Sequence, residues 1–329
     1  MWVKLNIHKV TVIALVLFAL SGLLVVALDW GDVRRIIGQA DWAELLPSVL
    51  LAAVSYACVS YSLALVFRTF GVGLTTRDAM EIGFVSGAMD NLLNTGGVTG
   101  LSVQFLLVKR RGVATESILA PSLFQIYVSS LMLFALLPLG LINVLATRHL
   151  SQGDTFGLSI VSAILIAFLA GASLLVFAGS LRSAVFRGLA QAAHFITHRR
   201  IDTELNDFDS ALSRGVALMR QRPKMLGILL LLSMGDWAST VAALWFCFSA
   251  LGNPVGIGTL LTGFTLGIAA GFVSLVPGGL GVQEASMAGI FALLGVPIGL
   301  AILAAILFRI VYYFIPFLVS LSFYRRLLR

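Results

Sequence analysis

The segment Pro277-Gly278-Gly279-Leu280-Gly281-Val282-Gln283-Glu284 interrupts a long apolar stretch, residues 255–295, with residues that oppose a helix. Proline lacks the N–H that a helix interior needs, and glycine has a low helix propensity. Non-helical backbone at membrane depth persists only where protein or a water-filled cavity satisfies its polar groups. If this stretch lies in a bilayer, we predict a helical hairpin over 255–295 whose turn faces the protein interior.

The composition indicates that lipid is the solvent for most of this chain. Hydrophobic residues make up 59% of the 329 residues, charged residues only 11%, and the mean hydropathy is +1.01. Because about 20 apolar residues cross a bilayer core, we predict an all-α polytopic membrane protein with about six full spans. We expect the first to be a retained helix rather than a cleaved signal peptide. The predicted spans are 10–28, 45–67, 117–145, 157–179, 225–250 and 299–323.

The basic residues are distributed unevenly and predict an orientation. If Lys4 and Lys9 are cytoplasmic, only Arg34, Arg35 and Arg148 of the 22 basic residues lie on the outer side, and Arg309 falls within a span. Basic loops favour the cytoplasmic side, so we predict cytoplasmic N- and C-termini and a bacterial inner-membrane location. The same asymmetry accounts for the net charge of +7, and nothing else favours nucleic acid as a partner.

A second interrupted stretch, residues 79–107, predicts another hairpin. It lies between Arg77 and the basic run that begins at Lys109, and both flanks favour the cytoplasm. A segment that enters and leaves by one face is re-entrant, and Asn94, Gly96 and Gly97 provide its turn. The span 225–250 runs outward from Lys224, and the last span must end inside at Arg325. The hairpin over 255–295 must therefore enter and leave by the outer face.

The two hairpins belong to an internal repeat. Gly96-Gly97 matches Gly278-Gly279, and Leu123-Phe124-Gln125 falls opposite Leu307-Phe308-Arg309 in the same order. Inverted repeats whose broken helices meet near the midplane form one architecture of membrane transporters. Chance recurrence among 32 glycines is the simpler alternative. We predict one transmembrane domain, 1–329, made of 1–44 (first helix and outer loop), 45–145 (first unit), 146–224 (outer loop, helix and amphipathic cytoplasmic segment) and 225–329 (second unit).

Ionisable residues inside a bilayer are costly and are candidates for function. The candidates are Asp90, Asp236, Glu284 and Arg309. Each also has a structural interpretation: Glu284 and Arg309 pair, Asp236 bonds a neighbouring helix instead of gating or binding a proton, and Asp90 lies in the hydrated interface. The neutral polar companions are Asn91, Asn94, Gln104, Gln125 and Gln283, which hold helices together more often than they bind ligands.

The glycine turns suggest an anion site. Helix ends at the turns containing Gly96, Gly97, Gly278 and Gly279 would offer free amides to a lipid phosphate. Alternatively, the small residues only allow helices to approach closely.

The sequence indicates neither enzyme chemistry nor a cofactor. It contains no phosphate-binding loop, no His-Glu-x-x-His and no Gly-x-Ser-x-Gly, and Cys58 and Cys247 both lie in apolar spans. His194 and His198 are four residues apart, but a solvated basic helix face explains them better than a metal site.

From Pro277 to Glu284, and at Phe308-Arg309 and Tyr312-Tyr313, the chain resembles the lysylphosphatidylglycerol synthase transmembrane-region family, which includes the flippase-like half of the bacterial multiple peptide resistance factor. The resemblance covers nearly the whole chain and implies lipid translocation. Gln283 stands where the family often has a basic residue. No synthase domain follows Arg329, so the resemblance implies a stand-alone member whose lipid is open.

These observations lead to three hypotheses about function. The first is a flippase that moves a phospholipid, glycolipid or isoprenoid-linked lipid. Arg309 and the turns would hold its phosphate, and Glu284 with Asp236 or Asp90 would contact a polar or cationic head group. The second is an ion-coupled carrier of a small solute. The third is a membrane scaffold for a separate lipid- or glycan-modifying enzyme, and the sequence also leaves a homo-oligomer open.

Overall fold

The structure is a computed structural model that describes residues 30–93, 97–113, 116–147, 220–273 and 282–328, with scattered residues between 156 and 217. Four described helices are long and apolar enough to cross a membrane: Trp42–Thr69, Ser117–Ile142, Pro223–Ala250 and Ile298–Leu328. They match four of the six predicted spans. The span 10–28 lies outside the described residues, and 157–179 is described only at scattered positions.

The described part is built from helices in two runs of similar order. The first run is α2 (Trp30–Gly38), η1 (Trp42–Glu44), α3 (Leu45–Thr69), α4 (Thr76–Leu93), α5 (Val98–Arg110) and α6 (Glu116–Thr147). The second is α10 (Pro223–Ala250), α11 (Ile257–Val273), α12 (Val282–Leu293), α13 (Ile298–Arg309), η3 (Ile310–Phe314) and α14 (Ile315–Leu328). In both runs a long helix precedes two shorter ones, and a long helical segment follows.

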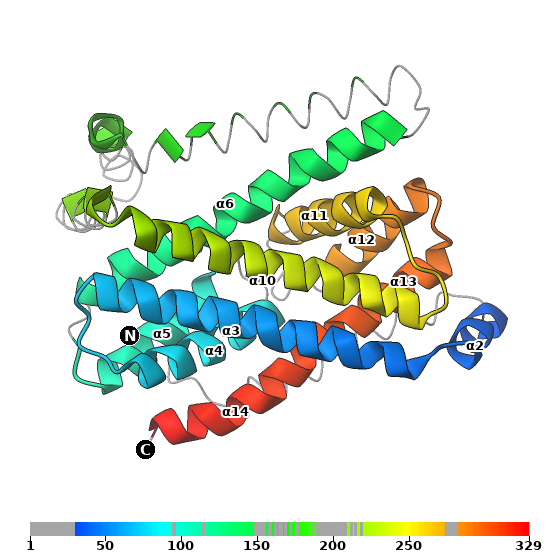
Figure 1. The fold of residues 1–329 in the computed structure, drawn as a ribbon, viewed down its shortest axis with the longest axis horizontal. Coiled ribbons are helices and arrows are strands. Elements are labelled where there is room, and N and C mark those ends of the chain that lie inside the picture. The colour runs from blue at the N-terminus through cyan, green and yellow to red at the C-terminus, as the bar shows by residue number, and fades with distance from the viewer. Residues whose placement is uncertain are drawn as a thin grey trace.

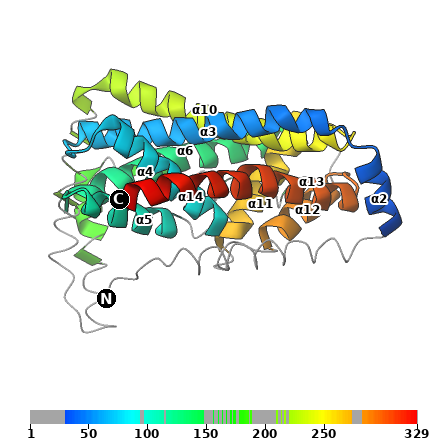
Figure 2. The same ribbon diagram turned by 90° about the horizontal axis from the view of Figure 1, so that it is seen from below.

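Helices α3 and α10 run side by side along the length of the molecule (Figures 1 and 2). Their outer faces are apolar and exposed, with Leu46, Leu50 and Val54 on α3 and Leu231 and Met234 on α10. Apolar stripes of this kind suit lipid rather than water as the surrounding solvent. The chain is therefore a membrane-embedded protein.

The shorter helices form two adjacent pairs, α4 with α5 and α11 with α12. In Figure 1, α4 begins near the left end of the molecule and α5 returns to it, whereas α11 and α12 begin and end toward the right. Each pair packs on one or more of the long helices: α4 lies against α3, and α11 lies against α6. The last turns of α4 and α11 therefore point toward the middle of the molecule.

The last span contains a π-helical turn, η3, which lies between α13 and α14. Pro316 follows this turn at the second residue of α14 and has no N–H to give to the carbonyl of Tyr312, four residues earlier. A π turn beside a proline relieves the contact between the proline ring and the preceding turn. The sequence analysis predicted a full span over 299–323 and did not predict the π turn within it.

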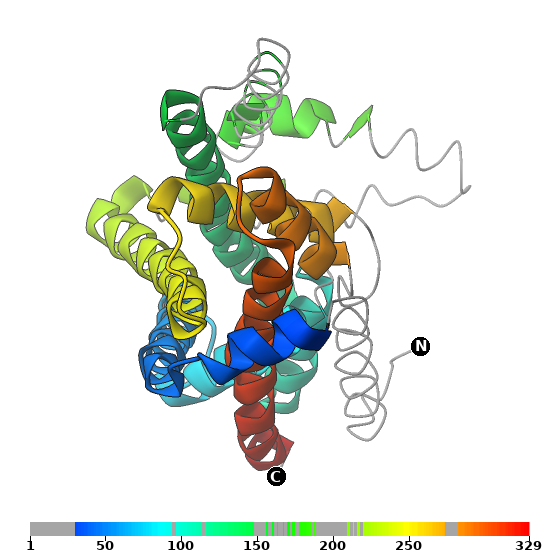
Figure 3. The same cartoon turned by 90° about the vertical axis from the view of Figure 1, so that its right-hand side faces the viewer.

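The connection 29–44, described from the sequence only as an outer loop, contains the short helix α2. Val33 on α2 is buried against the core, and Ile36, three residues on, packs beside it, while Arg34 and Arg35 are exposed. Apolar residues at helical spacing thus attach this helix to the bundle. Figure 3 looks along the molecule from the end at which α2 lies.

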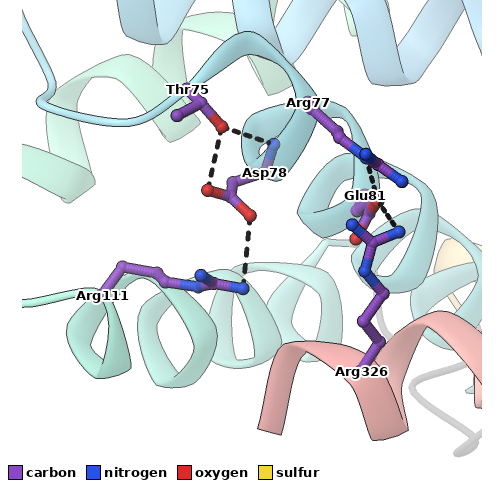
Figure 4. A network of polar contacts seen from close by, with 6 residues as sticks. All are labelled: Thr75, Arg77, Asp78, Glu81, Arg111 and Arg326. Carbon is purple, nitrogen blue, oxygen red and sulfur yellow. Dashed lines mark hydrogen bonds and ion pairs between the residues drawn. The ribbon is translucent and has the colours of Figure 1, made fainter. Parts of the chain in front are cut away.

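Polar side chains join three helix ends at the opposite end of the molecule (Figure 4). Glu81 on α4 accepts from Arg77 at 3.1 Å and from Arg326 of α14 at 2.9 Å. Arg111, just after α5, contacts Asp78 at 3.2 Å, and the Asp78 backbone N–H donates to the Thr75 hydroxyl at 3.1 Å. This ion-pair network holds the start of α4 against the ends of α5 and α14.

Glycines allow the paired helices to approach closely. A Cβ on Gly267 of α11 would lie 2.8 Å from Cβ and 3.0 Å from Cα of Met287 on α12. A Cβ on Gly100 of α5 would lie 3.0 Å from Cβ of Asp90 on α4. Small residues at helix contacts are the usual way in which membrane helices pack.

We expect Gly267→Ala to lower thermal stability in detergent by about 1–3 kcal/mol, because the added methyl group must displace the backbone of α12. Gly289→Ala on α12 is the matched control, since a Cβ there meets nothing within 4 Å. Thermal unfolding followed by intrinsic fluorescence measures both. Equal stability of the two variants would contradict the close packing of α11 on α12.

Candidate functional site

A cavity of about 390 Å³ lies where the two helix pairs face the long helices. Its lining comes from α3, α4, α5, α6, α10, α11, α12 and η3, so both pairs contribute. This volume falls within the range of small-molecule and cofactor sites. The polar lining residues are Ser86, Asp90, Asn91, Gln104, Gln125, Ser129, Ser130, Asp236, Thr240, Gln283, Tyr312 and Tyr313.

The described lining of the cavity is acidic. Asp90 of α4 and Asp236 of α10 belong to its lining, which includes no lysine, arginine or histidine. Asp236 is buried, with 5% of its surface exposed, whereas Asp90 is only partly buried. Two carboxyl groups in a protein interior favour a ligand that brings hydrogen-bond donors or positive charge.

Asp236 is held by hydroxyl groups from three helical elements. The Ser55 hydroxyl on α3 donates to Oδ1 of Asp236, and its oxygen lies 2.6 Å from the Tyr312 hydroxyl of η3. The Thr240 hydroxyl, one turn along α10, lies 2.8 Å from the Tyr312 hydroxyl and 2.8 Å from the Asp236 carbonyl oxygen. The network therefore joins α3, α10 and η3 at the edge of the cavity.

The π turn of η3 is fixed by a hydrogen bond from another helix. The Tyr56 hydroxyl on α3 donates to the Tyr312 carbonyl at 3.0 Å, which replaces the donor that Pro316 lacks. The Asn91 side-chain amide on α4 in turn donates to the Tyr56 hydroxyl at 3.0 Å. A chain of side chains thus connects the first helix pair to the π turn of the last span.

Asp90 lies across the start of α5. The Gly100 backbone N–H, in the first turn of α5, donates to Oδ1 of Asp90 at 3.1 Å. Gly97 precedes this helix with φ of +93°, which an L side chain rarely adopts. One of the amides that the sequence analysis offered to a lipid phosphate therefore already binds a carboxylate, which suits the positive end of a helix.

Glu284 and Arg309 form a buried ion pair between α12 and α13. Their exposed fractions are 3% and 4%, and neither belongs to the described lining of the cavity. The Arg309 guanidinium also lies over the Tyr313 ring, 5.7 Å from its centroid, and Gln283 donates to the Tyr313 hydroxyl at 2.8 Å. The pair that the sequence analysis offered as one alternative thus forms, beside the cavity rather than in it.

Comparison with known proteins identifies the family. The model for the lysylphosphatidylglycerol synthase transmembrane region matches residues 8–320. The chain belongs to this family.

Two relatives show how far the likeness extends. A UPF0104 membrane protein from Methanothermobacter thermautotrophicus is 27% identical over 206 residues, which cover 57% of this chain and 58% of that protein. A phosphatidylglycerol lysyltransferase from Staphylococcus aureus is 31% identical over 91 residues, 28% of this chain and 11% of the relative. The chain thus spans less than two thirds of the length of these relatives.

Several predicted site residues of this family member lie outside the described residues. They are Asn94, Gly96, Gly278 and Gly279, together with the rest of the turn from Pro277 to Gly281. Of the remaining candidates, the cavity brings together Asp90, Asp236 and Gly97, while Glu284 and Arg309 lie apart from them as a pair. Gln104, Gln125 and Gln283, noted in the sequence as neutral companions, all line the cavity.

The sequence analysis missed the hydroxyl partners of Asp236. Ser55 and Thr240 lie within apolar spans, where single hydroxyl residues are common and carry little signal. Tyr56 is equally inconspicuous on α3. The available signal was Pro316 inside a span, because it leaves the Tyr312 carbonyl in need of a donor from elsewhere.

We expect Arg309→Met to lower thermal stability by about 3–5 kcal/mol, because it leaves the Glu284 carboxylate buried without its partner. The double variant Glu284→Gln, Arg309→Met should recover most of this loss, since the remaining amide is neutral. Thermal unfolding in one detergent compares the variants. A double variant as unstable as the single one would contradict a purely pairwise structural role.

Proposed function

We propose that the chain moves a lipid, or a lipid-linked amphiphile, between the two leaflets of the bilayer. The observation that carries the proposal is the acidic cavity, which is lined by both helix pairs and by the π turn of the last span. Such a cavity provides a polar environment for a head group in a membrane-embedded chain, while the acyl chains stay in lipid. Family membership supports a lipid as the partner.

The proposed architecture is an inverted repeat with two re-entrant hairpins. Helices α5 and α12 have 13 and 12 residues, or about 18–20 Å at 1.5 Å per residue, which is less than the bilayer core. The pairs approach from opposite ends of the molecule, as an inverted repeat requires. The basic residues near Arg111 and Arg326 favour a cytoplasmic location for their end of the molecule, in a bacterial inner membrane.

The head group that suits this cavity is polar or cationic. Asp90 and Asp236 attract amines and hydroxyl donors, and the described lining has no basic residue for a phosphate. Arg309 does not bind the lipid phosphate in this proposal, because Glu284 already neutralises the charge of its guanidinium. The Staphylococcus aureus relative is named for the transfer of lysyl to phosphatidylglycerol, and a lysyl group adds amines to a head group.

We propose transport rather than synthase or hydrolase chemistry. A separate lipid-modifying enzyme would then supply the lipid, as a partner or at a distance. The remaining site candidates, Asn94, Gly96, Gly278 and Gly279, lie outside the described residues and stay predictions from the sequence.

A topology experiment tests the re-entrant hairpins. A spin label on Leu93→Cys, at the end of α4, should lie near the bilayer centre, with high oxygen accessibility and low accessibility to a water-soluble relaxation agent. A label on Asn253→Cys, in the connection between α10 and α11, is the water-exposed control. A label at Leu93 that behaves like the one at Asn253 would mean that α4 crosses the membrane fully.

A reconstitution experiment tests transport. In vesicles that contain tail-labelled phosphatidylethanolamine, whose head group carries an amine, the wild type should move the label to the far leaflet faster than protein-free vesicles do. Asp90→Asn should slow this movement at least about tenfold, because it removes a charge that faces the head group. Glu44→Gln, outside the cavity, should leave the rate unchanged.

Movement no faster than in protein-free vesicles would count against a flippase. Uptake of a soluble amine without lipid movement would favour the small-solute carrier instead.

A further inference from the structure

The carboxyl groups in and beside the cavity differ in the hydrogen bonds that the structure describes for them. The Arg309 guanidinium binds Glu284, and the Gly100 backbone N–H binds Asp90. Guanidinium and amide groups only donate hydrogen bonds, so these contacts fit a carboxylate and not its protonated oxygen. Glu81, at the end of the molecule, likewise accepts from two arginines.

Asp236 faces hydroxyl groups, which both donate and accept. Ser55 donates to its Oδ1, and rotation of that hydroxyl would let it accept a hydrogen bond from the acid form of Asp236. The Ser55 oxygen lies 2.6 Å from the Tyr312 hydroxyl and 3.2 Å from that of Thr240, and either atom of each pair can be the donor. The network can therefore reverse its hydrogen bonds when Asp236 gains a proton, without movement of its heavy atoms.

Among the ionisable groups that surround it, Asp236 is the candidate for binding a proton. The ionisable side chains near it in the described part of the chain are Tyr56 and Cys58 of α3, Tyr312 and Tyr313 of η3, and Asp90 of α4. Beyond Tyr313 lies the Glu284–Arg309 pair of α12 and α13, with the Arg309 guanidinium over the Tyr313 ring. Helices α6 and α11 bring Gln125, Ser129 and Ile268 to the same cavity, and these do not ionise. The one cation among these groups is engaged with Glu284.

Asp236 also lines the cavity that we assign to the head group. Charge burial at this depth costs free energy, which either a proton or a bound cation relieves. One carboxyl group cannot bind a proton and a cation tightly at the same time, because a protonated acid no longer attracts a cation. Proton and cation thus compete at this position.

We propose that Asp236 is a proton-binding site that exchanges one proton for each amine-bearing head group moved, in the opposite direction across the membrane. The inference rests on the proposed function for its exchange step and on the hydroxyl network for its proton site. The Ser55, Thr240 and Tyr312 hydroxyls act as positioning groups that accommodate both states of the carboxyl group.

Two measurements test the two parts separately. The first follows the distribution of tail-labelled phosphatidylethanolamine between leaflets in vesicles that carry a pH gradient. One exchanged proton should change the leaflet ratio about tenfold for each pH unit of gradient, and reversal of the gradient should reverse the bias. Asp236→Asn should lose this bias, and Glu44→Gln, outside the cavity, should keep it.

The second measurement needs no transport. Infrared difference spectra of the full chain recorded against pH should show the carbonyl stretch of a protonated carboxylic acid, which Asp236→Asn removes and Glu44→Gln retains. If Asp236→Asn fails to fold, Ser55→Ala should shift the midpoint of this band, whereas Ser60→Ala should not. Ser60 is also buried on α3, but within the described part of the chain its hydroxyl donates to the Tyr56 backbone carbonyl and not to the Asp236 network.

The outcomes separate this inference from the proposed function. Lipid movement whose direction does not depend on the pH gradient overturns proton exchange but not the flippase proposal. A spectrum in which no band depends on Asp236 or Ser55 overturns the proton site. An Asp236-dependent band without any lipid movement supports the proton site and overturns the exchange step together with the proposed function.

Discussion

A carboxyl group in the middle of an apolar helix bundle has to be solvated by the protein itself, and much of this structure follows from that requirement at Asp236. The Ser55 hydroxyl takes the place of water at the carboxyl group, and the hydroxyls of Tyr312 and Thr240 continue the network from Ser55. Because unpaired polar groups are costly at this depth, these contacts fix α3, α10 and the π turn of the last span relative to one another. The cavity beside them is bounded by the same elements.

The sequence was sufficient for the parts of the fold that depend on long-range composition. Hydropathy alone located α3, α6, α10 and the last span, because each is longer and more apolar than a soluble helix would be. Glycine-rich interruptions, such as the one at Gly97, correctly separated α4 from α5. The acidic candidates Asp90 and Asp236 stood out because charges are rare in such helices, and both line the cavity.

The parts that the sequence did not predict depend on contacts between distant residues. Nothing local indicates that Ser55 meets Asp236, or that the Tyr56 hydroxyl bonds the Tyr312 carbonyl. The same limitation applies to Glu284 and Arg309. Their pairing was one of two alternatives, and only the packing of α12 against α13 places them together and outside the cavity lining.

The π turn in the last span separates two anchored halves. Arg309, at the end of α13, is paired with Glu284 of the second helix pair, whereas Arg326 of α14 is paired with Glu81 of the first. Between these two anchors lies the η3 turn, where Pro316 has removed a backbone hydrogen bond and Tyr312 borders the cavity. If one helix pair moves relative to the other, we expect the change in backbone angles to be concentrated at this turn. A change in the shape of the cavity would then accompany every shift between the two pairs.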